Sequence, residues 1–201
     1  MNAQRVVLVG AESTGKTTLA RDLCAALVRR GGGFAKTNWV PEYGRDYTIE
    51  KLALARARAA EAGQPTPGME TLVWTTADFV AIAREQNALE EREARAGGPV
   101  LICDTDAFAT AIWHERYLGA RSPEVEALAI GRPSLYLLTH VDDIAFEADP
   151  IRDGEHFRAW MTAAFVERLR ASAHRTELVR GTREQRVAVA TRAIDAWLAT
   201  D

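Results

Sequence analysis

The stretch RVVLVGAESTGKTTLA, residues 5–20, decides the fold of this chain. It begins with a short run of apolar and β-branched residues, which is typical of a buried strand. It continues with the pattern G-x-x-x-x-G-K-[ST] at residues 10–17 and then opens a segment whose apolar residues have helical spacing. This pattern between a strand and a helix is typical of a phosphate-binding loop. Since the pattern alone arises by chance in roughly one chain of this length in a hundred, and the flanking elements are also present, we predict a nucleotide phosphate site here.

The residue types of this loop fit the chemistry of a bound triphosphate. Gly10 and Gly15 let backbone N–H groups converge on phosphate oxygens, and the N-terminus of the following helix adds partial positive charge. Lys16 reaches the β- and γ-phosphates as a mobile cation, and the hydroxyl of Thr17 completes the coordination of Mg²⁺. The predicted nucleotide-binding residues of the loop are Gly10, Glu12, Ser13, Thr14, Gly15, Lys16, Thr17 and Thr18.

The composition is that of a globular protein. Of the 201 residues, 47% are hydrophobic and 26% are charged, so the chain is long and apolar enough to bury a core without disulfides. A net charge of −3 shows no broad basic field, and we expect no nucleic acid partner. The chain has no apolar run of about 18 residues and none that suits a signal peptide, and Cys24 and Cys103 lie in apolar stretches. We therefore expect a cytoplasmic protein that does not bind membranes, and the oligomeric state stays open.

Apolar runs that are typical of strands alternate with segments of helical periodicity along the whole chain. The expected strands are residues 5–9, 36–40, 100–103, 134–139 and 176–179. The expected helices are residues 16–30, 44–60, 70–96, 106–118, 123–130, 154–173 and 182–199. This alternation predicts a parallel sheet covered by helices on both faces. No internal repeat or shift in composition marks a boundary, so we expect residues 1–201 to form one domain.

Two aspartates follow the third predicted strand. Asp104 comes directly after the run VLIC at residues 100–103, and Asp106 lies two residues further on. A Mg²⁺-bound triphosphate usually needs a carboxylate at the end of a second strand, and Asp104 has that position. Either aspartate, like Thr105, also suits the N-cap of the following helix. We interpret Asp104 as a metal ligand together with Thr17, and Asp106 as a second candidate for the site, with helix capping as the alternative.

The motifs beyond the loop favour a small-molecule kinase among P-loop proteins. Switch GTPases carry D-x-x-G and N-K-x-D motifs, but residues 104–107 lack the glycine and residues 139–142, THVD, lack the asparagine and the lysine. AAA+ motors and transport ATPases have longer chains with additional motifs. Small-molecule kinases of about this length bind the acceptor beyond strand two and close an arginine-bearing lid after strand four.

Both features of such kinases have candidates in this sequence. Glu42, in PEYGRDY at residues 41–47, follows the second strand and is expected to face the phosphate loop across the carboxyl edge of the sheet. Arg152, in DPIRDG at residues 149–154, follows the fourth strand and is expected to stabilise the charge of the transferring phosphoryl group. The alternative for both residues is an ordinary solvated loop charge.

Four segments carry a resemblance to a known family. They are GAESTGKTTLA at residues 10–20, PEYGRDY at residues 41–47, DFVAIAREQ at residues 78–86 and DTDAFATA at residues 104–111. With them the chain resembles the ribosylnicotinamide kinase domain of bacterial NadR-type NAD-biosynthesis proteins and their single-domain relatives, from residue 5 to about residue 198. The family's D-G-x-R lid pattern reads DPIR at residues 149–152, with proline in place of glycine. Gly181 and Thr182 resemble the loop on which such kinases rest the adenine.

The resemblance implies both the fold and the reaction. The fold is α/β of the P-loop nucleoside- and nucleotide-kinase-like class, with a five-stranded parallel sheet in the order 2-3-1-4-5, an acceptor-binding helical region at about 42–98 and a lid at about 141–154. The reaction is the ATP- and Mg²⁺-dependent phosphorylation of nicotinamide riboside at its 5′-hydroxyl, which gives nicotinamide mononucleotide in NAD salvage. The chain has no room for the adenylyltransferase domain of NadR-type proteins, so we expect the kinase step alone.

Two other functions remain open at this point. A deoxynucleoside or nucleotide kinase would share the loop, the metal site and the lid, and only the acceptor pocket separates it from a nicotinamide riboside kinase. A regulatory module that senses ATP without turnover would need only the phosphate loop, whereas a kinase needs Glu42, Asp104 and Arg152 in one cleft. The sequence also leaves the choice between ATP and GTP open.

Within the kinase hypothesis, the predicted catalytic residues are Lys16, Glu42, Asp104 and Arg152. Because a carboxylate bound to a metal is a poor base, we favour Glu42 as the general base and Asp104 as the Mg²⁺ ligand, with the reverse as the alternative. The flat, cationic pyridinium of nicotinamide riboside favours aromatic partners, and Asp78 is expected to hold a ribose hydroxyl or add charge. The alternative for the aromatic residues is ordinary packing of helix on sheet. The predicted substrate-binding residues are Trp39, Glu42, Tyr43, Arg45, Trp74, Asp78, Phe79 and Asp106.

Overall fold

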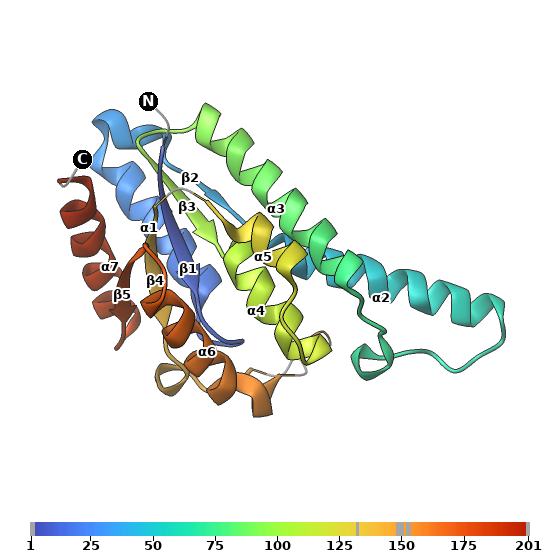
Figure 1. Ribbon diagram of the computed structural model, residues 1–201. Coiled ribbons are helices and arrows are strands. Elements are labelled where there is room, and N and C mark those ends of the chain that lie inside the picture. Colours follow the sequence, from blue (N-terminus) through green and yellow to red (C-terminus); the bar gives the residue numbers. More distant parts are fainter. Residues whose placement is uncertain (1–2, 132, 148–150, 152–153, 200–201) are drawn as a thin grey trace.

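Five parallel strands form one sheet in the order β2-β3-β1-β4-β5 (Figure 1). The computed structural model describes residues 3–131, 133–147, 151 and 154–199. The strands are β1 (Gln4–Val9), β2 (Asn38–Val40), β3 (Val100–Asp104), β4 (Leu135–Thr139) and β5 (Arg175–Val179). The helices are α1 (Lys16–Arg30), α2 (Tyr43–Glu61), α3 (Thr76–Ala96), α4 (Ala107–Leu118), α5 (Pro123–Ala129), α6 (Arg158–Arg170) and α7 (Arg183–Leu198). The predicted parallel sheet with strand order 2-3-1-4-5 is confirmed.

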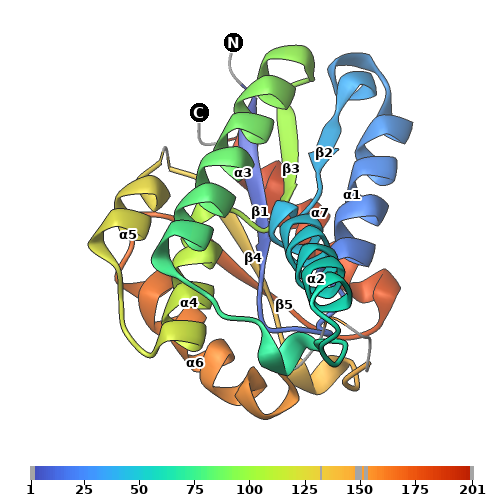
Figure 2. The same ribbon diagram turned by 90° about the vertical axis from the view of Figure 1, so that its right-hand side faces the viewer.

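The hydrophobic core lies on both faces of the sheet, with α1 and α7 on one side and α3, α4 and α6 on the other (Figure 2). β3 and β4 are buried along their whole length, as expected for central parallel strands. On one face Leu23 of α1 packs in a cluster with Ile194 of α7, and on the other Ile112 of α4 packs with Phe165 of α6. Each of these fully buried side chains contributes about 1.5–3 kcal/mol to folding. The result is a rigid sheet whose carboxyl edge carries the loops with candidate functional residues.

Several element boundaries differ from the sequence prediction, and α6, for example, covers Arg158–Arg170 instead of residues 154–173. α3 begins later than predicted, because Thr75 and Asp78 form a capping box that starts the helix. The Asp78 carboxylate accepts from the Thr75 backbone N–H at 2.7 Å, and the Thr75 hydroxyl accepts from the Asp78 N–H at 3.4 Å. β2 begins only at Asn38, because Gly32–Lys36 form a 3₁₀ turn. The T-x-x-D signature of the capping box was present in the sequence and could have placed the start of α3.

The helical region between β2 and β3 stands beside the carboxyl edge of the sheet, and α2 projects beyond the body of the protein (Figure 1). An apolar cluster that includes Phe79 and Ile82 of α3 and Val125 of α5 holds α3 against α4 and α5. Trp74, in the loop that leads into α3, packs against this cluster. The region therefore forms a wall next to the phosphate loop. In the described part of the chain, neither α2 nor any other helix is long and apolar enough to cross a membrane.

Candidate active site

The phosphate loop between β1 and α1 depends on two glycines with positive φ. Gly10 has a φ of 145° and Gly15 a φ of 74°. A Cβ at Gly10 would lie 2.4 Å from Oγ1 of Thr139 and 2.8 Å from its carbonyl oxygen, so only glycine lets the loop begin this close to β4. A Cβ at Gly15 would lie 2.5 Å from Cδ1 of Ile144. The loop is therefore closely packed against the segment that follows β4.

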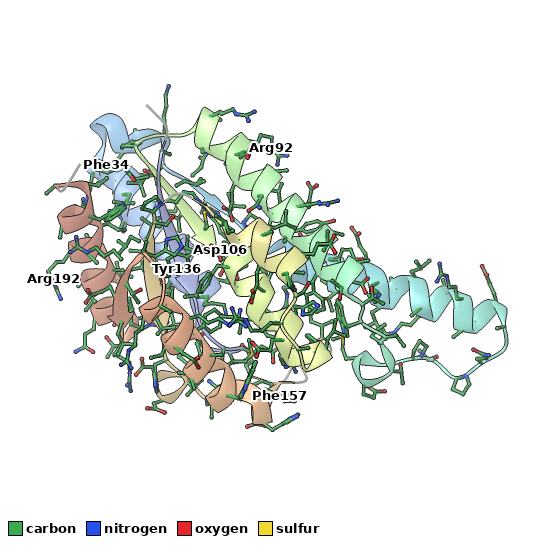
Figure 3. The ribbon with its side chains drawn as sticks, in the orientation of Figure 1. Phe34, Arg92, Asp106, Tyr136, Phe157 and Arg192 are labelled. Carbon is green, nitrogen blue, oxygen red and sulfur yellow. The ribbon has the colours of Figure 1, made fainter. Side chains whose placement is uncertain are left out.

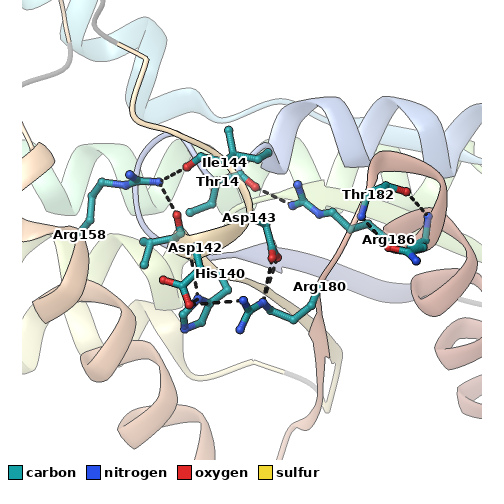
Figure 4. A network of polar contacts seen from close by, with 11 residues as sticks. Thr14, His140, Asp142, Asp143, Ile144, Arg158, Arg180, Thr182 and Arg186 are labelled. Atoms are coloured by element: carbon teal, nitrogen blue, oxygen red, sulfur yellow. Dashed lines mark hydrogen bonds and ion pairs between the residues drawn. The ribbon is translucent and has the colours of Figure 1, made fainter.

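Buried and partly buried hydrogen bonds hold the backbone of the loop. The hydroxyls of Thr14 and Thr139 are hydrogen-bonded to each other at 2.7 Å. Arg186 of α7 donates to the carbonyl of Thr14 at 2.6 Å, and Arg158 of α6 donates to the carbonyl of Ile144 at 2.8 Å and to two carbonyls of the loop (Figure 4). Sequence reasoning missed both arginines, since no motif distinguishes them from the other arginines of α6 and α7. The two arginines fix the backbone of the loop through its carbonyl groups, and the side of the loop that faces the cavity stays available to a ligand.

The inner side of the loop points at the end of β3. Nζ of Lys16 donates to two carbonyls of the loop itself, at 2.9 and 3.1 Å. The hydroxyl of Thr17 donates to Oδ2 of Asp104 at 2.5 Å. Burial raises the pKa of Asp104, and its buried Oδ1 has no hydrogen-bond partner among the described residues. This orphaned oxygen beside a hydroxyl fits a hydrated Mg²⁺, whose other ligands would be water and phosphate oxygens.

Glu42 stands at the carboxyl end of β2, directly before α2. Burial raises the pKa of its carboxyl group to about 7. The positive charges of Lys16 and Arg45 oppose this shift. The negative charges of Asp104 and Glu12 add to it. A carboxyl group with a pKa near neutral, close to the phosphate loop, is suited to take up a proton during a reaction.

One cavity of about 510 Å³ brings predicted phosphate-binding, metal-binding and acceptor-binding residues together. Its polar end is formed by the phosphate loop, Glu42 and Asp104. Arg152, the predicted lid arginine, lies outside the residues that the structure describes, although the neighbouring Ile151 borders the cavity. The predicted residues that line the cavity are Glu12, Ser13, Thr14, Gly15, Lys16, Thr17, Thr18, Trp39, Glu42, Arg45, Trp74, Phe79 and Asp104.

The other end of the cavity is an aromatic wall. The ring centroid of Trp74 lies 5.4 Å from that of Phe79 and 5.0 Å from that of Tyr117. Trp113 and Tyr117, one turn apart on α4, also line the cavity, and sequence reasoning missed them. The available signal was the spacing W-x-x-x-Y, which puts both rings on one face of a helix but does not tell which face is turned to the cavity. The wall offers flat aromatic faces to a planar ligand.

Two of the predicted substrate residues, Tyr43 and Asp78, do not line this cavity. Asp78 accepts from the hydroxyl of Tyr47 and from Nζ of Lys51, both at 2.7 Å, besides its part in the capping box of α3. Burial acts to raise the pKa of Asp78, but these hydrogen bonds outweigh it and lower the pKa. The ring of Tyr43 lies edge-on to that of Tyr47, with centroids 6.3 Å apart. Asp78 therefore joins α3 to α2, Tyr43 packs against the apolar cluster that includes Phe79, and neither side chain borders the cavity.

Asp106 also lies away from the cavity, in the interior next to Tyr136 (Figure 3). Its carboxylate caps α4 by accepting from the N–H of Ala109 at 3.0 Å, and it accepts from the hydroxyl of Tyr136. The reason is the backbone at Thr105, whose φ of 74° turns the chain away after Asp104. The expectation that Asp106 takes part in the metal or substrate site is replaced by its alternative, helix capping.

The predicted adenine loop joins β5 to α7. Gly181 has a φ of 101°, and the exposed Thr182 caps α7. Nε of Arg180, the preceding residue, donates to the two carboxylate oxygens of Asp143 at 3.0 and 3.1 Å (Figure 4). This pair joins the adenine loop to the segment after β4, where the predicted lid at 141–154 begins. The predicted adenine loop and the start of the predicted lid are thus neighbours at the carboxyl edge of the sheet.

A family model described as an AAA domain matches residues 5–186, which is most of the chain. The match runs from β1 to the first turn of α7 and includes the phosphate loop. Chain length argued against AAA+ motors, but the match shows that length does not separate this chain from proteins with an AAA domain. Comparison with curated proteins gave no match. A P-loop domain of this kind implies nucleotide binding.

Solved structures share the fold over nearly the whole chain. A NadR protein in complex with NR has 19% identity and a TM-score of 0.65, covering 97% of this chain and 49% of the other. The thymidylate kinase from Ehrlichia chaffeensis has 14% identity and a TM-score of 0.63, and the match covers 98% of this chain and 100% of that enzyme. A NadR protein with NAD and AMP-PNP has 18% identity and a TM-score of 0.59, covering 98% and 49%. The likeness shows a P-loop-kinase-like fold, and the chain spans about half the length of the NadR chains.

Proposed function

This chain belongs to the AAA domain family, and we propose that it is an ATP-dependent kinase that phosphorylates nicotinamide riboside at its 5′-hydroxyl. The observation that carries the proposal is the cavity in which Lys16, Glu42 and Asp104 meet at one end, with an aromatic wall at the other. A module that only senses ATP needs the phosphate loop but no buried carboxylate of raised pKa facing it. In this proposal the whole chain acts as one kinase unit in the cytoplasm, with residues 42–98 as the acceptor-binding region and 141–154 as the lid.

The side chains divide the phosphoryl transfer between them. Lys16 exchanges its two carbonyl partners in the loop for oxygens of the β- and γ-phosphates. Thr17 and Asp104 would hold Mg²⁺, which supplies neutralising charge at the phosphates. Glu42 accepts the proton of the 5′-hydroxyl as that oxygen bonds to the γ-phosphorus, the bond from this phosphorus to the bridging oxygen breaks, and ADP leaves. Arg152 remains the proposed lid arginine that stabilises charge on the transferring group.

The aromatic wall supports nicotinamide riboside as the acceptor. Its pyridinium ring is flat and cationic, and aromatic faces attract cations by about 0.5–2 kcal/mol per contact. Trp74, Phe79, Trp113 and Tyr117 all border the same end of the cavity or pack into its wall. The NadR protein that was crystallised in complex with NR has the same fold.

A deoxynucleoside or nucleotide kinase is the second candidate. The likeness to the thymidylate kinase extends over 98% of this chain and the full length of that enzyme. The phosphate and metal ends of the cavity would be the same for both candidates. The difference lies at the aromatic wall, which would stack on a neutral base in one case and on a cationic ring in the other.

A panel of acceptors tests the proposal. Purified protein with Mg-ATP is incubated with nicotinamide riboside, thymidine, deoxycytidine or thymidylate, and ADP release is measured. We expect the highest kcat/KM with nicotinamide riboside, and a Lys16→Ala protein prepared in parallel controls for contaminating kinases. The highest kcat/KM with one of the other acceptors would move the assignment to the second candidate. A lack of ADP release with every acceptor would leave the ATP-sensing module.

The Trp74→Ala variant is expected to raise KM for nicotinamide riboside by about tenfold, the equivalent of one lost aromatic contact of about 1.4 kcal/mol. KM for ATP should stay within about twofold, because Trp74 lies at the acceptor end of the cavity. Steady-state kinetics with each substrate varied in turn measures both constants. Trp160→Ala, which removes a partly exposed tryptophan of α6, is the matched control. A neutral isostere of the riboside that binds as tightly as the cation would contradict recognition by cation–π contacts.

A further inference from the structure

Glu42 occupies the N-cap position of α2, but its side chain does not cap the helix. Acidic side chains at or near a helix N-terminus accept hydrogen bonds from the free N–H groups of the first turn. Such bonds, together with the helix dipole, stabilise the ionised carboxylate and lower its pKa. The pKa of Glu42 is instead raised to about 7. Another group must therefore accept hydrogen bonds from the free N–H groups at the start of α2.

Gln86 of α3 takes this role for the first residue of the helix. Oε1 of Gln86 accepts the backbone N–H of Tyr43 at 3.0 Å. The side chain comes from a helix 43 positions away along the chain, and Gln86 is only 1% exposed although it borders the cavity. This bond satisfies one of the N–H groups that the first turn leaves free, and it fixes the peptide that joins Glu42 to Tyr43.

A second contact fixes the orientation of the Gln86 amide. Its Nε2 donates to Oε1 of Glu90 at 3.0 Å, one turn further along α3. Glu90 is itself paired with Arg5 of β1. A backbone N–H only donates, and a carboxylate paired with a guanidinium only accepts, so Oε1 must face Tyr43 and Nε2 must face Glu90. The chain of contacts thus runs from the start of β1 to the start of α2.

The side chain of Glu42 lines the cavity, where several charged groups act on it. The charged groups that act on it are Lys16 and Glu12 of the phosphate loop, Asp104 of β3 and Arg45 of α2. The place beside the carboxylate on α2 is occupied by Gly44, where a Cβ would lie 4.0 Å from Oε1 of Glu42 and 3.6 Å from Ile82. The carboxylate of Glu42 thus lies close to Gly44 at the start of α2 but accepts no capping hydrogen bond from this helix.

We propose that Gln86 is a positioning residue: by accepting the Tyr43 N–H, it fixes the peptide that joins Glu42 to Tyr43 and so keeps the carboxylate of Glu42 directed into the cavity. This inference rests on the proposed function, in which Glu42 receives the proton of the acceptor hydroxyl. Gln86 itself acts through Glu42 and does not touch the reacting atoms. The sequence contained Gln86 within the segment DFVAIAREQ but offered no reason to select it.

The Gln86→Met variant tests the inference, because methionine has a similar length and accepts no comparable hydrogen bond. We expect kcat to fall by about tenfold or more while KM for ATP and for nicotinamide riboside stay within about twofold. The midpoint of the pH profile of kcat/KM should fall by about one pH unit, because the released Glu42 can turn toward the N–H groups at the start of α2, which stabilise the ionised carboxylate. The double variant Q86E/E90Q exchanges the two partners and can retain all three contacts, so it should restore most of kcat, and the added negative charge beside Glu42 should keep the midpoint from falling below that of the wild type.

Asn87→Met is the matched control. Asn87 is the next residue on α3, and its Nδ2 donates to the carbonyl of Leu128 at 3.0 Å, so the variant loses one contact between helices without touching α2. We expect its kcat and pH midpoint to equal those of the wild type. A purely structural role for Gln86 would make both single variants behave alike, and that result would overturn the inference.

A measurement without turnover separates this inference from the proposed function. The ¹³C carboxyl resonance of Glu42, assigned with the Glu42→Gln variant, is titrated in the wild type and in Gln86→Met. A lower pKa of Glu42 in Gln86→Met supports the positioning role, whether or not the protein phosphorylates a nucleoside. An unchanged pKa, or a change confined to KM for the acceptor, overturns it. A lower pKa with unchanged kcat retains the positioning of Glu42 and contradicts Glu42 as the base.

Discussion

The Lys16→Ala variant is expected to lose phosphoryl transfer by about 10²–10³-fold, the cost of removing one preorganised charge from the transition state. Among the described residues, the hydrogen bonds of Nζ of Lys16 go to carbonyls of its own loop, and its charge acts on the carboxylates of Glu42 and Asp104 inside the same cavity. The loop backbone is held by Thr14, Arg158 and Arg186 and should remain in place. ADP release at saturating Mg-ATP and acceptor measures the loss, and thermal unfolding checks the fold.

Lys36→Ala is the matched control for this variant. Lys36 is an exposed lysine in the 3₁₀ turn before β2, away from the phosphate loop. Its removal changes the net charge by the same amount, so any general effect of charge on the attraction of ATP is shared by both variants. Wild-type ADP release from Lys16→Ala would contradict the assignment of the phosphate loop as the donor site.

The Glu42→Gln variant is expected to lower kcat/KM for the acceptor by about 10²-fold or more, because general base catalysis contributes at least that much. ATP binding should change little, because Glu42 faces the acceptor side of the transfer. A base works in its ionised form, so wild-type activity should be half-maximal near pH 7, the pKa of Glu42, and level off about one pH unit above it. At pH 6 the wild type should retain about a tenth of its plateau activity, and Glu42→Gln should lack this dependence.

The same substitution is expected to stabilise the folded protein at alkaline pH. Folding raises the pKa of Glu42 from 4.5 to about 7. Below about pH 4.5 the carboxyl group is protonated in both states and burial of its charge costs no stability. As the pH rises through 7 the unfolded chain is already ionised, and the loss of folding free energy reaches its full size. At pH 8 Glu42→Gln should therefore raise the free energy of unfolding by about 2–3 kcal/mol, and at pH 4 the difference should vanish. Urea unfolding at both pH values measures this, with Glu50→Gln at an exposed position of α2 as the control.

The kinetics of two variants test which carboxylate is the base and which is the metal ligand. We expect Asp104→Asn to raise the Mg²⁺ concentration needed for half-maximal activity and to keep the pH dependence. If Asp104→Asn instead removed the pH dependence, and Glu42→Gln raised the Mg²⁺ requirement, Asp104 would be the base and Glu42 the metal ligand.

The sequence by itself determined the elements whose signals are local. The phosphate loop is a contiguous pattern, and the strand before it and the helix after it follow from apolar spacing within about 15 residues. Asp104 could be placed at the carboxyl edge because the run VLIC leads directly into it. The resemblance implied the strand order, and the structure confirms it. The alternation of strands and helices had already limited the possible arrangements of a parallel sheet to a few.

Only the tertiary structure decided which neighbouring side chains share a site. Asp104 and Asp106 are two residues apart, yet a positive φ at Thr105, rare for a residue other than glycine, sends one to the cavity and the other beneath α4. Gln86 reaches Tyr43 across 43 positions of the chain, and Arg186 reaches Thr14 across 172. Contacts of this range depend on how whole helices pack on the sheet, because packing sets which face of each helix points to the cavity, and no local pattern of residues encodes it.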